Sequence, residues 1–291
     1  MIKHSKQLGF TLVEVIIVIA IMGIIGGLSA MIIGRSLDSY AALERRTNLQ
    51  TSIRLAVERI SREVRNALPH SLCVNDGGAC LATGKQFYFI PVKDSGRYQD
   101  RPGAYTAPMA GLRERLKRFP LKNLTFDVLS SDGDTVINNH INASKDDWVA
   151  VYSLNNTQIY SSPPNQVRNQ MDSVTLATTI NEVDKIKFYA GNNYFSNHSP
   201  TRRFHIIDNN KQVTLFSFDA ATGKLTRDTT LFSAPNGPSN PHLLMQNVQA
   251  CTFTYTPGAP QRAGLLRIDI TVTQQGETIQ VIHDAHVYNT P

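Results

Sequence analysis

The chain has 291 residues, of which 41% are hydrophobic and 18% are charged, and its formal net charge is +6. This composition excludes a disordered chain and provides for one large core or two smaller ones. Three cysteines exclude a disulfide-rich mini-protein, and a slightly negative mean hydropathy excludes a protein with many membrane spans. Most of the basic surplus lies before residue 69, so the nearly neutral remainder predicts no nucleic-acid partner.

The first predicted element is a membrane span near the N-terminus. Residues 15–33 (VIIVIAIMGIIGGLSAMII) carry no charge, and about 20 apolar residues let a helix cross a bilayer. Lys3 and Lys6 precede the span, and basic residues stay on the cytoplasmic side, so the bulk of the chain is predicted to lie outside. A cleaved secretory signal with small residues at 27–30 and an ordinary signal anchor are two alternatives.

Glu14 is the feature that neither alternative explains. A carboxylate at the centre of a membrane helix costs about 2.5–3.5 kcal/mol, so an acid in a span indicates a function and a partner. Its context is Gly9-Phe10-Thr11-Leu12-Val13-Glu14, after a short basic leader. This pattern resembles the class III signal of type IV pilins and type II secretion pseudopilins.

The resemblance implies a specific maturation. A prepilin peptidase would cut between Gly9 and Phe10, remove the leader 1–9 and N-methylate the new terminal Phe10. The apolar helix would be retained, and Glu14 would face the new amine of a neighbouring subunit. An opposite charge within a few ångströms favours the ionised form of both groups, and either charge alone in the bundle would cost several kcal/mol. Glu14 and Phe10 are therefore the predicted filament-assembly pair.

The helix is predicted to continue beyond the membrane. Ile53, Val57, Ile60, Val64 and Leu68 recur at spacings of three and four, which indicates one apolar stripe. Pro69 is predicted to end it. We expect a helix over 10–68, transmembrane over 10–34 and an amphipathic stalk over 35–68. The head, 69–291, would follow.

The head is predicted to consist mostly of antiparallel β-structure, so the fold class is α+β. Short β-rich runs occur at Lys85–Ile90, Leu121–Leu129, Trp148–Leu154, Lys185–Tyr189, Arg203–Ile207 and Val213–Phe218. Alternation is clearest near the C-terminus, where 251–255, 266–273 and 278–288 predict a three-stranded antiparallel meander with one face on the stalk helix. Residues 155–165 and 233–241 are predicted to be loops. No domain boundary within the head is evident.

The three cysteines fit an oxidising exterior. Cys73 and Cys80 flank a turn-rich segment, and Cys251 lies on a predicted strand. A Cys73–Cys80 bond or a bond from one of them to Cys251 is expected, with one thiol left over. The spacing of these residues predicts no metal site.

No catalytic residues are predicted, and we expect neither an enzyme nor a cofactor. His283 and His286 are three apart on a strand and would point to opposite faces. Asp146-Asp147 and Asp132-Gly133-Asp134 are interpreted as turns rather than calcium ligands. The basic cluster 113–119 is interpreted as a solvated segment rather than a DNA contact.

A narrower resemblance rests on 62–71, 247–255, 262–266 and 286–291. These passages look like the larger minor pilin of mannose-sensitive haemagglutinin (MSHA) pilus systems, the MshO type. They are similar, more distantly, to the J-type minor pseudopilin of type II secretion. The likeness implies a pilin-like fold and a minor pilin that initiates or caps a filament.

The same likeness implies the partners and the location. The partners would be prepilin peptidase, other minor and major pilins, and an inner-membrane assembly platform with its ATPase. The protein would sit in the bacterial inner membrane by one helix, with its N-terminus cytoplasmic and its head periplasmic, before it enters the filament. A J-type pseudopilin, or a tip subunit that binds a surface or DNA, are the alternatives.

Overall fold

The computed structural model describes residues 11–98, 125–129, 140–154, 156–160, 167–178, 184–189, 195, 197–210, 213–232, 241–258 and 263–287. The chain divides into two compact units, Met1–Thr51 and Ser52–Pro291. The basic cluster 113–119, the acidic turn 132–134 and the predicted loop 233–240 lie outside the described residues.

The N-terminal helix α1 runs over Leu12–Arg65, 54 residues or about 80 Å. It ends three residues before the expected end at Leu68, so that boundary was wrong. A residue before proline is disfavoured in the helical region, and Leu68 instead donates its backbone N–H to the carbonyl of Ile90 at 2.7 Å. Ala67 forms a β-bridge with Pro91. The chain therefore leaves the helix to pair with the head.

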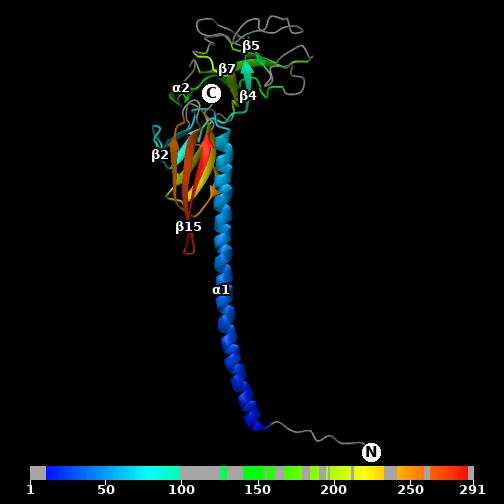
Figure 1. Cartoon of the computed structure of the whole chain (residues 1–291), viewed down its shortest axis with the longest axis vertical. Coiled ribbons are helices and arrows are strands. Elements are labelled where there is room, and N and C mark those ends of the chain that lie inside the picture. The colour runs from blue at the N-terminus through cyan, green and yellow to red at the C-terminus, as the bar shows by residue number, and fades with distance from the viewer. Residues whose placement is uncertain are drawn as a thin grey trace, which may run out of the picture. The chain divides into compact units, whose positions relative to one another are not determined.

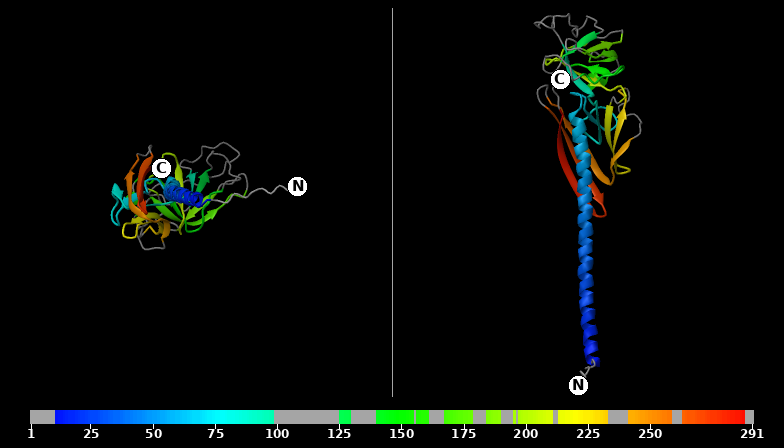
Figure 2. Two further views of the ribbon diagram at one scale, coloured as in Figure 1. Left: turned by 90° about the horizontal axis from the view of Figure 1, so that it is seen from below. Right: turned by 90° about the vertical axis from the view of Figure 1, so that its right-hand side faces the viewer.

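The stalk stripe is confirmed within the second unit. Ile53, Val57, Ile60 and Val64 are 0–4% exposed, and Figures 1 and 2 show this end of α1 alongside the strands of the head. The burial of such a stripe supplies most of the stability of an amphipathic helix. Leu55, off the stripe, stays 63% exposed.

Two antiparallel sheets pack face to face beside this end of α1. The larger sheet has the order β1-β3-β10-β11-β12, and the smaller has β15-β14-β13-β2. Phe87 on one sheet and Phe253 on the other meet edge to face, with ring centroids 4.7 Å apart. The larger sheet comprises β1 (Cys73–Asn75), β3 (Gln86–Phe89), β10 (Val213–Asp219), β11 (Lys224–Thr230) and β12 (His242–Met245).

The smaller sheet confirms the predicted meander. Its strands β13 (Val248–Thr256), β14 (Gly264–Gln274) and β15 (Glu277–Val287) pair antiparallel in chain order, and β2 (Thr83–Gly84) joins at the β13 edge. Gln275 and Gly276 adopt positive φ at the β14–β15 turn, as a tight hairpin requires. Leu266, Ile268 and Ile270 are fully buried, as their alternation predicts.

A six-stranded barrel is inserted between β3 and β10, which are neighbours in the larger sheet. Its strands close in the order β4-β5-β8-β7-β6-β9, and Figure 1 shows them as the green group beyond the end of α1. They comprise β4 (Asp94–Tyr98), β5 (Thr125–Leu129), β6 (Trp148–Ala150), β7 (Arg168–Thr175), β8 (Lys185–Phe188) and β9 (Arg203–Ile207). The sequence did not separate this lobe from the rest of the head.

The barrel has its own core, and a second core joins it to the sandwich. Phe126, Phe188 and Phe204 fill the barrel interior. The joining core takes Ile90 and Leu215 from the sandwich and Ala150 and Ile207 from the barrel. A short helix, α2 (Asn156–Tyr160), contributes to it, although a loop was expected over 155–165. Burial of Ile159 in the joining core explains why five polar-rich residues form a helix.

Candidate functional site

The N-terminal site begins at the first described residue. Thr11 caps α1: its side-chain oxygen accepts from the backbone N–H of Glu14 at 3.4 Å, and its carbonyl accepts from the same N–H at 3.1 Å. Glu14 thus lies in the first helical turn, where an acid also complements the helix dipole. Gly9 and Phe10 lie outside the described residues.

The face around Glu14 is apolar and uncovered. Leu12, Val13, Ile16 and Ile17 are 52–78% exposed, and Glu14 itself is exposed. The start of α1 reaches a mean hydropathy of 2.7 and is long enough to cross a membrane. Such exposure in water would be costly, at about 25 cal/mol per Å² of apolar surface, so this segment fits a bilayer or a bundle of similar helices.

The cysteines divide into a bonded pair and a free thiol. Cys73 and Cys80 form a disulfide across seven residues, and Cys251 is free and buried. Burial, together with the nearby carboxylate of Asp269, raises the pKa of the Cys251 thiol. A buried thiol held protonated is chemically inert, so Cys251 is a core residue of β13.

The carboxylates of Asp146 and Asp147 make local structural contacts. Asp146 adopts positive φ and accepts from the hydroxyl of Tyr189. Asp147 accepts backbone N–H groups from Ser144 and Asn209 and pairs with Lys93 at 2.7 Å. These carboxylates brace turns. Among the described residues, no group of three or more His, Cys, Asp or Glu side chains could hold a metal ion.

The histidine pair also follows the strand alternation. His283 is half-buried and His286 is exposed, on opposite faces of β15. The two therefore form no shared site.

Sequence reasoning missed the junction between barrel and sandwich. Arg168 lies between the rings of Trp148 and Phe232, at 4.5 and 4.1 Å from their centroids, and donates from Nε to the carbonyl of Ile159 at 2.8 Å. Burial lowers the pKa of Arg168 to about 10, against a small opposing effect of Tyr160. The guanidinium is still charged at neutral pH and clamps the two lobes. No local pattern marks it, because its ring partners are far apart in sequence.

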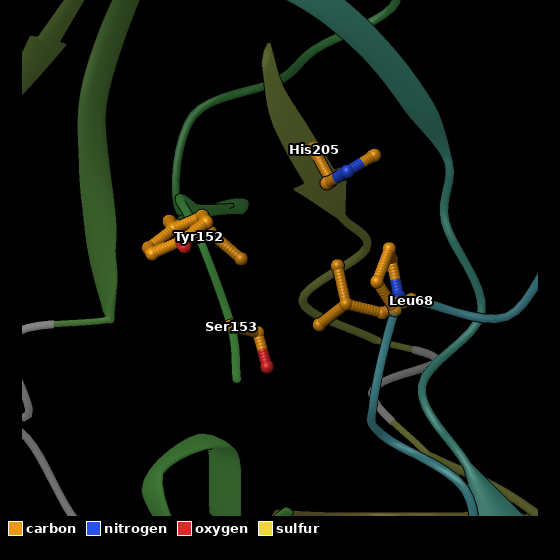
Figure 3. Close-up of a pocket in the computed structure, with 6 residues that line it drawn as sticks. Leu68, Tyr152, Ser153 and His205 are labelled. Carbon is orange, nitrogen blue, oxygen red and sulfur yellow. The ribbon is translucent and has the colours of Figure 1, made fainter. Parts of the chain in front are cut away.

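A narrow cleft lies on another part of the junction. Figure 3 shows it between Leu68, Tyr152, Ser153 and His205, with Pro69 and Ala150 completing the lining. The alternation in Arg203–Ile207 is the one sequence signal for it, because it places His205 on the face opposite Phe204 and Ile206.

The comparisons with known proteins bear on the first of these sites. The prokaryotic N-terminal methylation motif matches residues 4–30, which include the predicted cut and Glu14. The chain thus has the N-terminal signal of type IV pilin-like prepilins, followed by an α+β fold of the pilin type. The chain matches no curated protein and no solved structure.

Proposed function

We propose that this chain is a minor pilin of an MSHA-like type IV pilus, a structural subunit rather than an enzyme. One observation carries the proposal: the methylation motif leads directly into an apolar helical segment whose large hydrophobic side chains between Leu12 and Ile33 are 45–78% exposed. A prepilin peptidase removes residues 1–9, and α1 then holds the protein in the inner membrane with the head in the periplasm. An assembly platform and its ATPase transfer the subunit into the filament beside other pilins.

Glu14 and the new N-terminus supply the register of that assembly. Cleavage leaves the amine of Phe10 one residue before the cap Thr11 and four before Glu14. The helix dipole already places partial positive charge at this end, so the added ammonium needs an anion from outside its own helix. Glu14 of the neighbouring subunit supplies it in a medium where an unpaired charge costs several kcal/mol.

The test is the mass of the mature N-terminus. We expect the native protein to begin with N-methylated Phe10, and Gly9→Val to accumulate as full-length precursor in the membrane. In the same strains Glu14→Ala should be cut at the same bond yet enter pili at a small fraction of the native level. The matched control is Glu58→Ala, which removes an exposed acid of the same helix and should leave both steps unchanged. A native N-terminus at Met1, or one near residue 30, would refute the proposal.

The phenotype of a deletion strain distinguishes a pilus subunit from a type II secretion pseudopilin. Loss of the gene product should reduce surface pili and leave type II secretion intact. The opposite result would assign the chain to a J-type pseudopilin, while an N-methylated Phe10 would still stand.

A further inference from the structure

The cleft at the junction contains polar groups with nothing to bind. Three buried polar atoms line the cleft: the two ring nitrogens of His205 and the hydroxyl oxygen of Ser153. Among the described residues, none of the three has a hydrogen-bond partner. Ser153 as a whole is 3% exposed. The gap between the lining residues is too narrow to admit a water-sized sphere.

These unpaired groups make the closed cleft costly. A buried donor or acceptor without a partner loses its hydration and gains nothing in return. Tyr152 adds strain, since this non-glycine residue holds a φ of 47° beside the cleft. Figure 3 shows His205 on β9 and Leu68 on the chain after α1, with Tyr152 and Ser153 on the segment that follows β6. Opening the cleft would separate these segments and let water reach all three polar atoms.

The rest of the junction is held firmly. Arg168 clamps Trp148 against Phe232. The hydroxyl of Tyr160 donates to the carbonyl of Ser71 at 2.8 Å. The unpaired polar atoms thus lie in one part of the junction and the Arg168 clamp in another.

In the part of the chain that the structure describes, the charged side chains that share a strand face with His205 are cations. On its own strand, Arg203 shares the outer face of the barrel. On β4, the cross-strand partner of His205 is Ser95, and Arg97 shares its face. Lys93, just before β4, lies on that face too and is paired with Asp147.

The remaining neighbours add no negative charge at neutral pH. On β6 the partner of His205 is Ala150, and the following segment presents the phenol of Tyr152 and the hydroxyl of Ser153. The chain after α1 presents Leu68 and Pro69, followed by His70, whose own pKa burial lowers. Burial first, and Arg203 second, lower the pKa of His205 to about 4.

We propose that this cleft is an acid-opened joint, in which protonation of His205 parts the barrel from the chain segment after α1 while the Arg168 clamp stays closed as the pivot. The direction of the pH effect follows from the difference in proton binding between the open and closed forms. An exposed imidazole takes up its proton near pH 6.5 and the buried one only at much lower pH, so the open form binds the proton first. The opening equilibrium constant rises about tenfold per pH unit below pH 6.5 until the closed form also protonates.

Hydrogen exchange of the full-length protein in detergent micelles tests the joint. After correction for intrinsic exchange, peptides spanning 66–70 and 151–154 should lose protection by one to two orders of magnitude (about tenfold per pH unit) between pH 6.5 and 4.5. Peptides from β13 and β14 should change little. Fluorescence of Trp148, the single tryptophan of the chain, should keep its emission maximum because the clamp stays closed.

Substitution assigns the effect to His205. His205→Phe keeps the ring shape and removes the titration, so the acid-induced loss of protection at 66–70 and 151–154 should vanish. His205→Gln gives the same readout should phenylalanine fail to pack. The matched control His242→Phe changes an exposed histidine of β12 and should retain the native response. The inference is overturned if the native protein shows no local loss, if both His205 variants keep it, or if Trp148 emission shifts together with it.

Discussion

At the residue scale, the most informative side chain is a buried cation that no motif predicts. Arg168 is 2% exposed, and its guanidinium contacts two aromatic rings and donates to a backbone carbonyl. Contact of a cation with an aromatic face is worth about 2 kcal/mol when water is excluded. This interaction offsets part of the free-energy cost of burying the guanidinium. The same burial lowers the pKa of Arg168.

Replacing Arg168 should weaken the junction measurably. Arg168→Met keeps the bulk but removes the ring contacts and leaves the Ile159 carbonyl without its donor, so we expect a loss of about 2 kcal/mol in the free energy of unfolding. Urea unfolding in detergent measures it. Arg267→Met is the control, because Arg267 lies half-exposed on β14 in a surface pair with Asp284 and should cost less than about 1 kcal/mol. Equal losses in both variants would contradict the assigned role of Arg168.

At the element scale, the edge strand β2 of the smaller sheet lies so close to the backbone of the disulfide loop that it requires a glycine. A Cβ on Gly84, in β2, would lie 2.4 Å from the carbonyl oxygen of Asn75, inside the disulfide loop. Asn75 itself is fixed by pairing with Gln86 and by donating from Nδ2 to the carbonyl of Gly78. The loop therefore cannot move aside, and β2 reaches β13 only with glycine at this position.

Two glycines of this region make a matched pair. Gly84→Ala should lower the free energy of unfolding by about 3 kcal/mol, because a methyl group forced against fixed backbone strains the packing. Gly78→Ala meets nothing within 4 Å and should change stability by less than about 0.5 kcal/mol. Urea midpoints of the two variants decide the point, and a Gly84→Ala midpoint equal to the native one would show that the loop yields.

At the scale of the folded head, the joining core makes barrel and sandwich dependent on each other. Ile90, Leu215, Ala150 and Ile207 belong to one buried cluster although two come from each lobe. A shared core favours cooperative unfolding over separate domain transitions. Trp148 reports on this boundary, since its ring meets Phe232 edge to face at 5.8 Å.

We expect one unfolding transition for the head at pH 7.5. Urea curves followed by Trp148 fluorescence, by near-ultraviolet circular dichroism and by the β-sheet signal should coincide. The control is Trp148→Phe, measured by near-ultraviolet circular dichroism and by the β-sheet signal. It shows whether the tryptophan side chain itself affects the transition. Separated midpoints would show that the barrel is an independent domain.

Local periodicity was enough to predict several parts of the fold. The N-terminal motif, the buried stripe of α1 and the alternating strands β13 to β15 repeat within a few residues, and burial of one face fixes such patterns. Strand β9 was also predicted with its observed bounds, Arg203–Ile207. By contrast, the expected helix end at Leu68 was wrong, and so was the expected loop at 156–160, the described part of 155–165, because tertiary pairing at Ile90 and burial of Ile159 override local preference.

The choice of cysteine partner, the barrel and the junction depend on how the folded chain brings its elements together. β4 pairs with β9 more than 100 residues later, with Ser95 opposite His205, and no spacing in the sequence records such a contact. Cys251 was excluded from the disulfide because its strand buries it in the sandwich core while Cys73 and Cys80 meet across one loop. The clamp of Arg168 and the unpaired His205 exist only once the two lobes meet, because burial and charge are properties of surroundings that the folded chain creates.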